Sequence, residues 1–175
     1  MGFDLKGLKP KQNTNINTYK LYGMIEQIES FEERWRLRDA MSENDQEQYW
    51  KEYNQYNDDN PGVYFRNNCW WWRPLWNYVC QTCSDILTDK DQASGNYNDG
   101  HEISRSKAKR ISKRLFDLVD KGLTSKWQDE YEKEIKKLSD SEDEDDKYAS
   151  QYPFSEGNVK RFAVFCKESG GFTIC

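Results

Sequence analysis

Apolar residues recur at steps of three and four along most of the chain, the spacing that places side chains on one face of an α-helix. Good N-cap residues precede several of these series, namely Ser42, Ser104 and Ser155, and Gly122 can end a helix as a C′ glycine. The pattern predicts about six helices, near residues 19–35, 42–56, 74–87, 104–121, 127–138 and 155–166. Pro74 is expected in a first helical turn, where its missing N–H costs nothing.

Polar stretches without a period flank and separate these helices. Residues 1–18 are expected to form an irregular N-terminal arm, and residues 89–103 a loop rich in Gly and Asn. The acidic run within 140–151 is expected to be a solvated linker. The sequence therefore predicts an all-α fold, a compact bundle with an aromatic-rich core. Its helical core domain spans 19–139, and a C-terminal helix and tail at 152–175 dock on it.

Composition narrows the class of protein. Aromatic residues make up 15% of the chain, while Val and Ile are scarce, which argues against an extensive sheet. A net charge of -5 disfavours duplex nucleic acid as a partner. No apolar run approaches the ~18 residues of a membrane span, and the first residues lack the features of a signal peptide. We therefore expect no membrane partner and a cytoplasmic location.

Five cysteines in such a chain indicate reduced thiols rather than a disulfide framework. Cys80-x-x-Cys83 has the spacing of half a zinc site, which Cys166, Cys175 or His101 would have to complete. No second pair has matching spacing, so we predict neither a metal nor a cofactor.

The most informative segment is the tryptophan block, Tyr64–Trp76, which holds four of the seven tryptophans. Three successive indoles on a helix fan over roughly 200° and cannot share one face. The rings are either an aromatic core buried on several sides, or at least one of them lines a pocket. Indoles stack on flat ligands, arginines hold phosphate or carboxylate, and asparagines read polar edges. The candidate ligand-binding residues here are Arg66, Asn67, Asn68, Trp71, Trp72 and Arg73.

A second candidate segment precedes the helix capped by Ser104. Asn98, Asp99 and the chain's single histidine, His101, converge on that helix N-terminus, which attracts anions through its free N–H groups. The alternative is that these residues only order a turn. A pair of His101 with Cys69 or Cys80 is formally available for catalysis, but no surrounding signature supports it. We therefore leave enzymatic activity open and lean against it.

Four sequence blocks occur together over most of the chain. They are Met1-Gly2-Phe3-Asp4 with Gly7, Leu8 and Pro10; Tyr-Phe-Arg-Asn-Asn-x-Trp-Trp-Trp-Arg-Pro-Leu-Trp at 64–76; Asn98 through Ser104; and Tyr152-Pro153-Phe154-Ser155 with Asn158, Phe162, Cys166 and Ser169-Gly170-Gly171-Phe172. In these blocks the chain resembles a family of uncharacterised proteins carried by tailed bacteriophages. Longer members carry a cysteine-rich insert similar to a zinc knuckle before the Tyr-Pro-Phe-Ser block, where this chain has its acidic run. The resemblance implies an origin and no catalytic residues.

Taken together, we expect a phage accessory protein, acting in the host cytoplasm, that counters host defence. It would bind and sequester a small anionic, nucleotide-derived ligand without catalysis, and a homo-oligomer is compatible with that role. One alternative is a protein-binding inhibitor of a host defence or regulatory factor, because exposed Trp, Tyr and Arg are common in protein interfaces. The other is a small hydrolase using Asp99 and His101.

Overall fold

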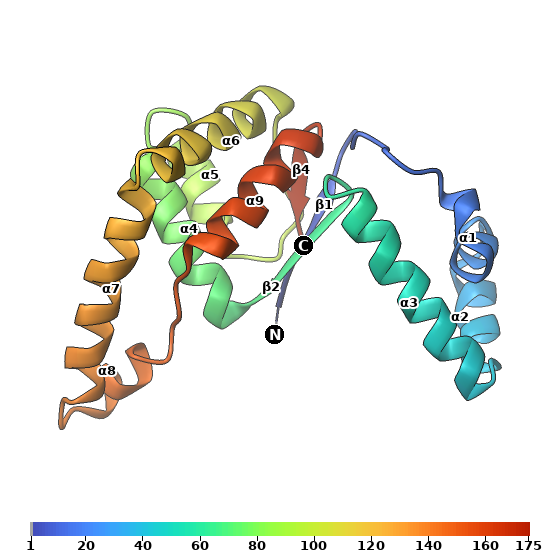
Figure 1. The fold of residues 1–175 in the computed structure, drawn as a ribbon, viewed down its shortest axis with the longest axis horizontal. Helices are drawn as coiled ribbons and strands as arrows, with labels where there is room; N and C mark the ends of the chain where they lie inside the picture. The colour runs from blue at the N-terminus through green and yellow to red at the C-terminus, as the bar shows by residue number, and fades with distance from the viewer. Residues whose placement is uncertain (1) are drawn as a thin grey trace.

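The computed structural model describes residues 2–175 and contains one antiparallel sheet among its helices. The four strands lie in the order β2-β1-β4-β3. Their bounds are β1 Gly2–Gly7, β2 Tyr64–Asn68, β3 His101–Ile103 and β4 Phe172–Ile174. The sheet thus joins the two ends of the described chain with two segments from its middle (Figure 1).

Helices account for most of the described residues, so the predicted all-α fold is correct as far as a mainly helical protein, whereas the four-stranded sheet was not predicted. The 3₁₀ helix η1 spans Ile16–Thr18. The α-helices are α1 Lys20–Glu26, α2 Phe31–Asp39, α3 Glu43–Asp59, α4 Cys69–Thr82, α5 Asp89–Ser94, α6 Arg105–Asp120, α7 Leu123–Ser139, α8 Glu144–Ala149 and α9 Glu156–Glu168. Among the residues described, no helix is both long enough and apolar enough to cross a membrane.

The helices form two groups, one on each side of the paired strands β1 and β2. The connection between these strands leaves the sheet and folds into α1, α2 and α3, which stand apart on the right of Figure 1. We call this part the α1–α3 lobe; its small core consists of Tyr19, Tyr22, Ile25, Tyr49 and Tyr56. Helices α4 to α9 pack with the sheet as the main body.

Alternation along the strands gives the sheet one apolar face and one polar face. On β1, Phe3 and Leu5 are buried in the core of the main body, while Asp4 and Lys6 are not. On β2, Phe65 packs on Phe162 of α9, with ring centroids 5.4 Å apart. The polar face therefore turns toward the side on which the α1–α3 lobe lies.

The regions predicted to be irregular contain strands and short helices instead. Gly2–Gly7, assigned to an irregular arm, is the strand β1, whereas Met1 lies outside the described residues. The predicted loop at 89–103 contains α5 and β3, and the acidic run continues into α8. The first predicted helix is two helices, α1 and α2, and Pro74 lies inside α4 because that helix already begins at Cys69.

The predicted N-cap serines and the predicted glycine at the end of α6 are confirmed. Side chains of Ser42, Ser104 and Ser155 each accept a hydrogen bond from the backbone N–H three residues on. Gly122 adopts a φ of +67° between α6 and α7, a left-handed conformation that glycine adopts without a steric penalty.

Candidate functional site

The tryptophan block divides its rings between the core and the surface. Trp72 and Trp76 are fully buried, with ring centroids 5.3 Å apart in a stacked arrangement. The indole N–H of Trp72 donates to the Gly95 carbonyl at 2.7 Å. Trp70 is half-buried, whereas Trp71 is 36% exposed. The successive indoles therefore point in different directions, as predicted. Trp72 is a core residue, however, and its assignment as a ligand-binding residue is wrong.

Both asparagines before the block have structural roles. Asn67 is buried, and its side-chain amide donates to the side chain of Asn158 on α9 at 3.1 Å. Asn68 is the N-cap of α4 and accepts a hydrogen bond from the Trp71 backbone at 3.1 Å. Asn67 is therefore withdrawn from any ligand, and Asn68 uses its side-chain oxygen to cap α4; neither residue lines a pocket with Arg73 or Arg66.

The Asn98–His101 segment is held by contacts within the protein. The Asn98 amide donates to the Gly2 carbonyl at 2.8 Å, and Asp99 accepts from the backbone N–H of His101 at 3.1 Å. The His101 ring reaches Asp91, with Nε2 and Oδ1 2.9 Å apart. The alternative interpretation, a segment that orders a turn, therefore describes Asn98 and Asp99 better than ligand binding does.

Asp91 of α5, which contacts this segment through His101, was not predicted to be part of a site. It is 3% exposed and accepts hydrogen bonds from Lys107, from His101 and from both the backbone N–H and the hydroxyl of Thr88. Burial alone would raise the pKa of this carboxyl, but the hydrogen bonds from Lys107, His101 and Thr88 outweigh it and hold the pKa well below its usual range. The Thr88-x-x-Asp91 spacing of a capping box was the available signal.

The cysteines do not form a metal site with other side chains of the described residues. Cys80 lies in the last turn of α4 and Cys83 caps that helix, where it is buried. Within residues 2–175, no three His, Cys, Asp or Glu side chains are grouped so that they could hold a metal ion.

The two predicted arginines lie in two different grooves. Arg73 lines a cavity of about 380 Å³ between α4 and α7, beside Trp127, Tyr131 and Tyr152. Its guanidinium donates to the Tyr152 hydroxyl at 3.0 Å. Glu134 lines the same cavity, so this site has little net positive charge.

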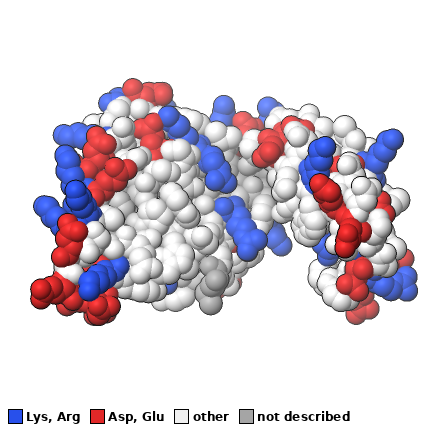
Figure 2. Space-filling model, turned by 60° about the horizontal axis from the view of Figure 1, so that its bottom comes forward, with Lys and Arg blue, Asp and Glu red and all other residues white. Residues whose placement is uncertain are grey.

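Arg66 lies in the second groove, a cavity of about 550 Å³ between α3, β2 and α9 that we call the inter-lobe groove. Lys160 and Arg161 of α9 join Arg66 in its lining, and Asp58 is the one acidic lining residue. Figure 2 shows Lys and Arg side chains gathered at the hollow between the main body and the α1–α3 lobe. Three cations against one carboxylate give this groove a positive lining.

The charges of these cations are unequally neutralised. Arg66 lies 3.5 Å from Asp4, and Lys160 lies 2.6 Å from Glu156 on the same helix. Arg161 forms no salt bridge with any of the described residues, and its guanidinium carbon lies 5.5 Å from the centroid of the Phe65 ring. Arg161 is therefore the cation most available to an anion in the groove.

Besides Asp58, α3 and β2 supply neutral polar groups to the groove. Asn54 and Asn57 present amides, and Tyr53 and Tyr64 present phenol rings whose centroids are 6.5 Å apart. Burial raises the pKa of both phenols, and the hydrogen bond that Tyr64 donates to Asp4 raises that of Tyr64 further. The tyrosines therefore stay uncharged near neutral pH and do not repel an anion.

Tyr53, Asn57 and Tyr64 also line a neighbouring cavity of about 580 Å³, together with Asp4 and Lys6. The open, polar face of the sheet thus continues the inter-lobe groove. The pair Lys160 and Arg161 was not predicted as part of a site. The helical phase of α9 marks both as facing away from the core, but no local signal shows that they meet Arg66.

Comparison with known proteins gave no match for this chain among family models, curated proteins or solved structures.

Proposed function

We propose that the protein binds an anionic, nucleotide-derived ligand in the inter-lobe groove without catalysing its conversion. The observation that carries this proposal is the convergence of Arg66, Lys160 and Arg161 on one groove whose described lining contains a single carboxylate, that of Asp58. On the resemblance to bacteriophage proteins, the ligand would be a signal of host defence that the protein sequesters.

The lining divides into groups that suit the parts of a nucleotide. Guanidinium and ammonium groups bind phosphate oxygens, with arginine able to form two parallel hydrogen bonds. The amides of Asn54 and Asn57 both donate and accept, which suits base edges and ribose hydroxyls. The rings of Tyr53 and Tyr64 offer surfaces for stacking. A volume of about 550 Å³ lies within the usual range of small-molecule sites.

Isothermal titration against cyclic nucleotides and ADP-ribose derivatives tests this proposal. We expect at least one member to bind, and Arg161→Gln to weaken its binding about tenfold, the loss of one charge-assisted contact. Arg105→Gln is the matched control, because Arg105 is an exposed arginine at the start of α6, outside the groove. No binding by any member, or equal binding by the two variants, would contradict the proposal.

A second candidate function, capture of an acidic segment of a host protein, rests on the outer edge of β2. Asp4 exchanges backbone hydrogen bonds with Cys175, at 2.9 and 2.8 Å, so its N–H and C=O point away from β2. Its register partner Arg66 therefore directs its own N–H and C=O to the opposite, free side of the sheet, as does Tyr64 by alternation. An extended peptide can add to such an edge, and the basic lining favours acidic side chains.

The two candidates make different predictions for one competition experiment. An extended peptide of alternating Glu and Val binds only under the second candidate, and its N-methylated counterpart, which lacks the strand-pairing N–H groups, does not bind. If a nucleotide from the panel binds and the peptide neither binds nor displaces it, the groove is a small-molecule site.

A further inference from the structure

The α1–α3 lobe exposes large apolar side chains that its small core leaves uncovered. Trp35 of α2 is 58% exposed and Trp50 of α3 is 50% exposed. Other exposed apolar residues of this lobe are Met24, Phe31 and Leu37. Exposed indoles in a group are typical of interaction sites, because water solvates them poorly.

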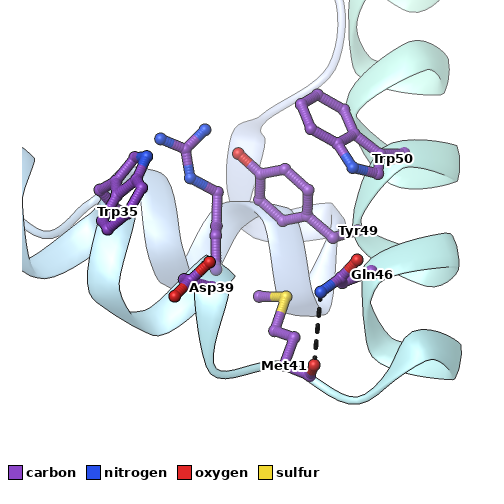
Figure 3. Close-up of a pocket in the computed structure, with 7 residues that line it drawn as sticks. Trp35, Asp39, Met41, Gln46, Tyr49 and Trp50 are labelled. Carbon is purple, nitrogen blue, oxygen red and sulfur yellow. Dashed lines mark hydrogen bonds between the residues drawn. The ribbon is translucent and has the colours of Figure 1, made fainter.

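Trp35 and Trp50 face each other across a pocket of about 290 Å³ between α2 and α3. Figure 3 shows the two indoles on opposite sides, with Tyr49 between them. Trp50 is braced by edge-on contacts with Tyr49 and Tyr53, with ring centroids 5.2 and 5.5 Å apart. The Tyr49 hydroxyl donates to Glu26 at 2.7 Å. Trp50 and Tyr49 are therefore held in place before any ligand binds.

Arg38 supplies the polar group of this pocket. Its guanidinium carbon lies 5.9 Å from the centroid of the Tyr49 ring, and Arg38 forms no salt bridge within residues 2–175. Its Nε is buried and has no hydrogen-bond partner, the one side-chain atom of the described residues in that state. The two Nη groups of Arg38 are not buried in this way and form no hydrogen bond with a described residue, so they are the donors that a ligand can reach.

We propose that this pocket binds a carboxylate carried on an apolar frame. The two Nη groups of arginine form a fork that matches the two oxygens of a carboxylate. The indoles of Trp35 and Trp50 would pack against the frame on either side.

Two features distinguish this ligand from the phosphate expected in the inter-lobe groove. Asp39 lines the pocket beside Arg38, so one cation is offset by one carboxylate, and a singly charged carboxylate is favoured over a doubly charged phosphate. The pocket is also about half the size of the inter-lobe groove. The carboxylate has two chemical sources, a free organic acid or the C-terminus of a polypeptide that ends in an apolar residue.

Isothermal titration with four probes tests the chemistry and separates these sources. The probes are 3-phenylpropionate, 3-phenylpropionamide, an acetylated pentapeptide with a free C-terminal Phe, and the same peptide amidated at its C-terminus. We expect an acid to bind and its amide to bind at least tenfold more weakly. Tighter binding by the peptide acid identifies a polypeptide as the source, and tighter binding by 3-phenylpropionate identifies a free acid.

Two substitutions on α2 provide the matched comparison. Arg38→Gln should weaken carboxylate binding at least tenfold, whereas Arg36→Gln, an exposed arginine outside the pocket, should not change it. Arg38→Lys keeps the charge but loses the fork and should also bind poorly, and thermal melting confirms that each variant is folded. Equal binding of acid and amide, equal effects of Arg38→Gln and Arg36→Gln, or no binding of any probe at millimolar concentration would overturn the proposal. None of these outcomes depends on the inter-lobe groove.

Discussion

The imidazole Nε2 of His101 lies 2.9 Å from Oδ1 of Asp91, a carboxylate that is almost completely buried. This contact ties β3 to α5, and Lys107 adds α6 to the same carboxylate. The single histidine therefore belongs to an internal ion cluster that fixes three elements, and it does not lie in either arginine-lined groove.

We predict that Asp91→Asn lowers the free energy of unfolding by about 3 kcal/mol at pH 7, the typical effect of removing one partner from a buried ion pair. The pKa of Asp91 is lower in the folded protein than the ~3.9 of an unfolded chain. Its stabilisation is therefore complete above pH ~4 and is lost as the pH falls through the folded pKa. The difference between variant and wild type should accordingly shrink at pH 3, as measured by denaturant unfolding at both pH values.

The control for this experiment is Asp99→Asn. Asp99 is exposed, and an asparagine oxygen can accept the same hydrogen bond from the His101 backbone. We expect a change of less than about 0.5 kcal/mol, as for most surface substitutions. If the two variants lose similar stability, the carboxylate of Asp91 does not have the role described.

We predict opposite outcomes for two adjacent tryptophans. Trp72→Ala should cost about 3–5 kcal/mol of unfolding free energy, because it removes a fully buried ring stacked between Phe3 and Trp76. Trp71→Ala should cost less than about 1 kcal/mol, because that ring is partly exposed. Chemical denaturation of both variants measures this difference, and a similar loss in both would contradict the assignment of Trp72 to the core.

The helices could be predicted from the sequence because their signals are local. A helix cap acts within one turn of the helix end that it sets. This holds for the N-caps Ser104 and Ser155 and for Gly122, which follows the end of α6. The apolar stripes of α6 and α9 likewise lie within single segments.

The sheet could not be predicted because its pairing is non-local. Leu5 of β1 pairs with Phe65 on one side and with Ile174 on the other, and β3 and β4 have only three residues each. A strand of three residues has too little alternation to be recognised without its partner. Gly2–Gly7 therefore looked irregular until its neighbours were known.

The candidate site was predictable only in part for the same reason. Arg66 was identified from the residues around it, and it does lie in a groove. Lys160 and Arg161 are about ninety residues away in the chain and reach that groove only through the packing of α9 against β2. Conversely, Asn67 and Asn98 looked available because the partners that bind their amides, Asn158 and Gly2, are equally distant in sequence.

We predict that β1 is essential to the fold, in contrast to the irregular arm that the sequence suggested. Leu5→Ala should cost about 2–5 kcal/mol, because the side chain is fully buried between the strand and the helices of the main body. Lys6→Ala, the next residue and an exposed one, should leave the stability nearly unchanged. Thermal or denaturant unfolding of the pair tests this, and a stable Leu5→Ala variant would show that β1 is not part of the core.

We predict that the cysteines differ in their reactivity toward a disulfide reagent. Burial raises the pKa of Cys83 to about 11 and that of Cys166 well above its ordinary value, so neither forms much thiolate at pH 8. The thiolate is the reactive species, and both side chains are inaccessible, so a disulfide reagent should modify them only when the protein opens. Cys69 and Cys175 are only partly buried and should react before Cys83 and Cys166.

Mass spectrometry of the labelled peptides over time measures these rates in the native protein. In guanidinium chloride all five cysteines should react at similar rates, which serves as the control. Rapid native labelling of Cys166 would show that α9 does not stay packed on the sheet. Because α9 also carries Lys160 and Arg161, that result would remove the rigid wall on which the inter-lobe groove depends.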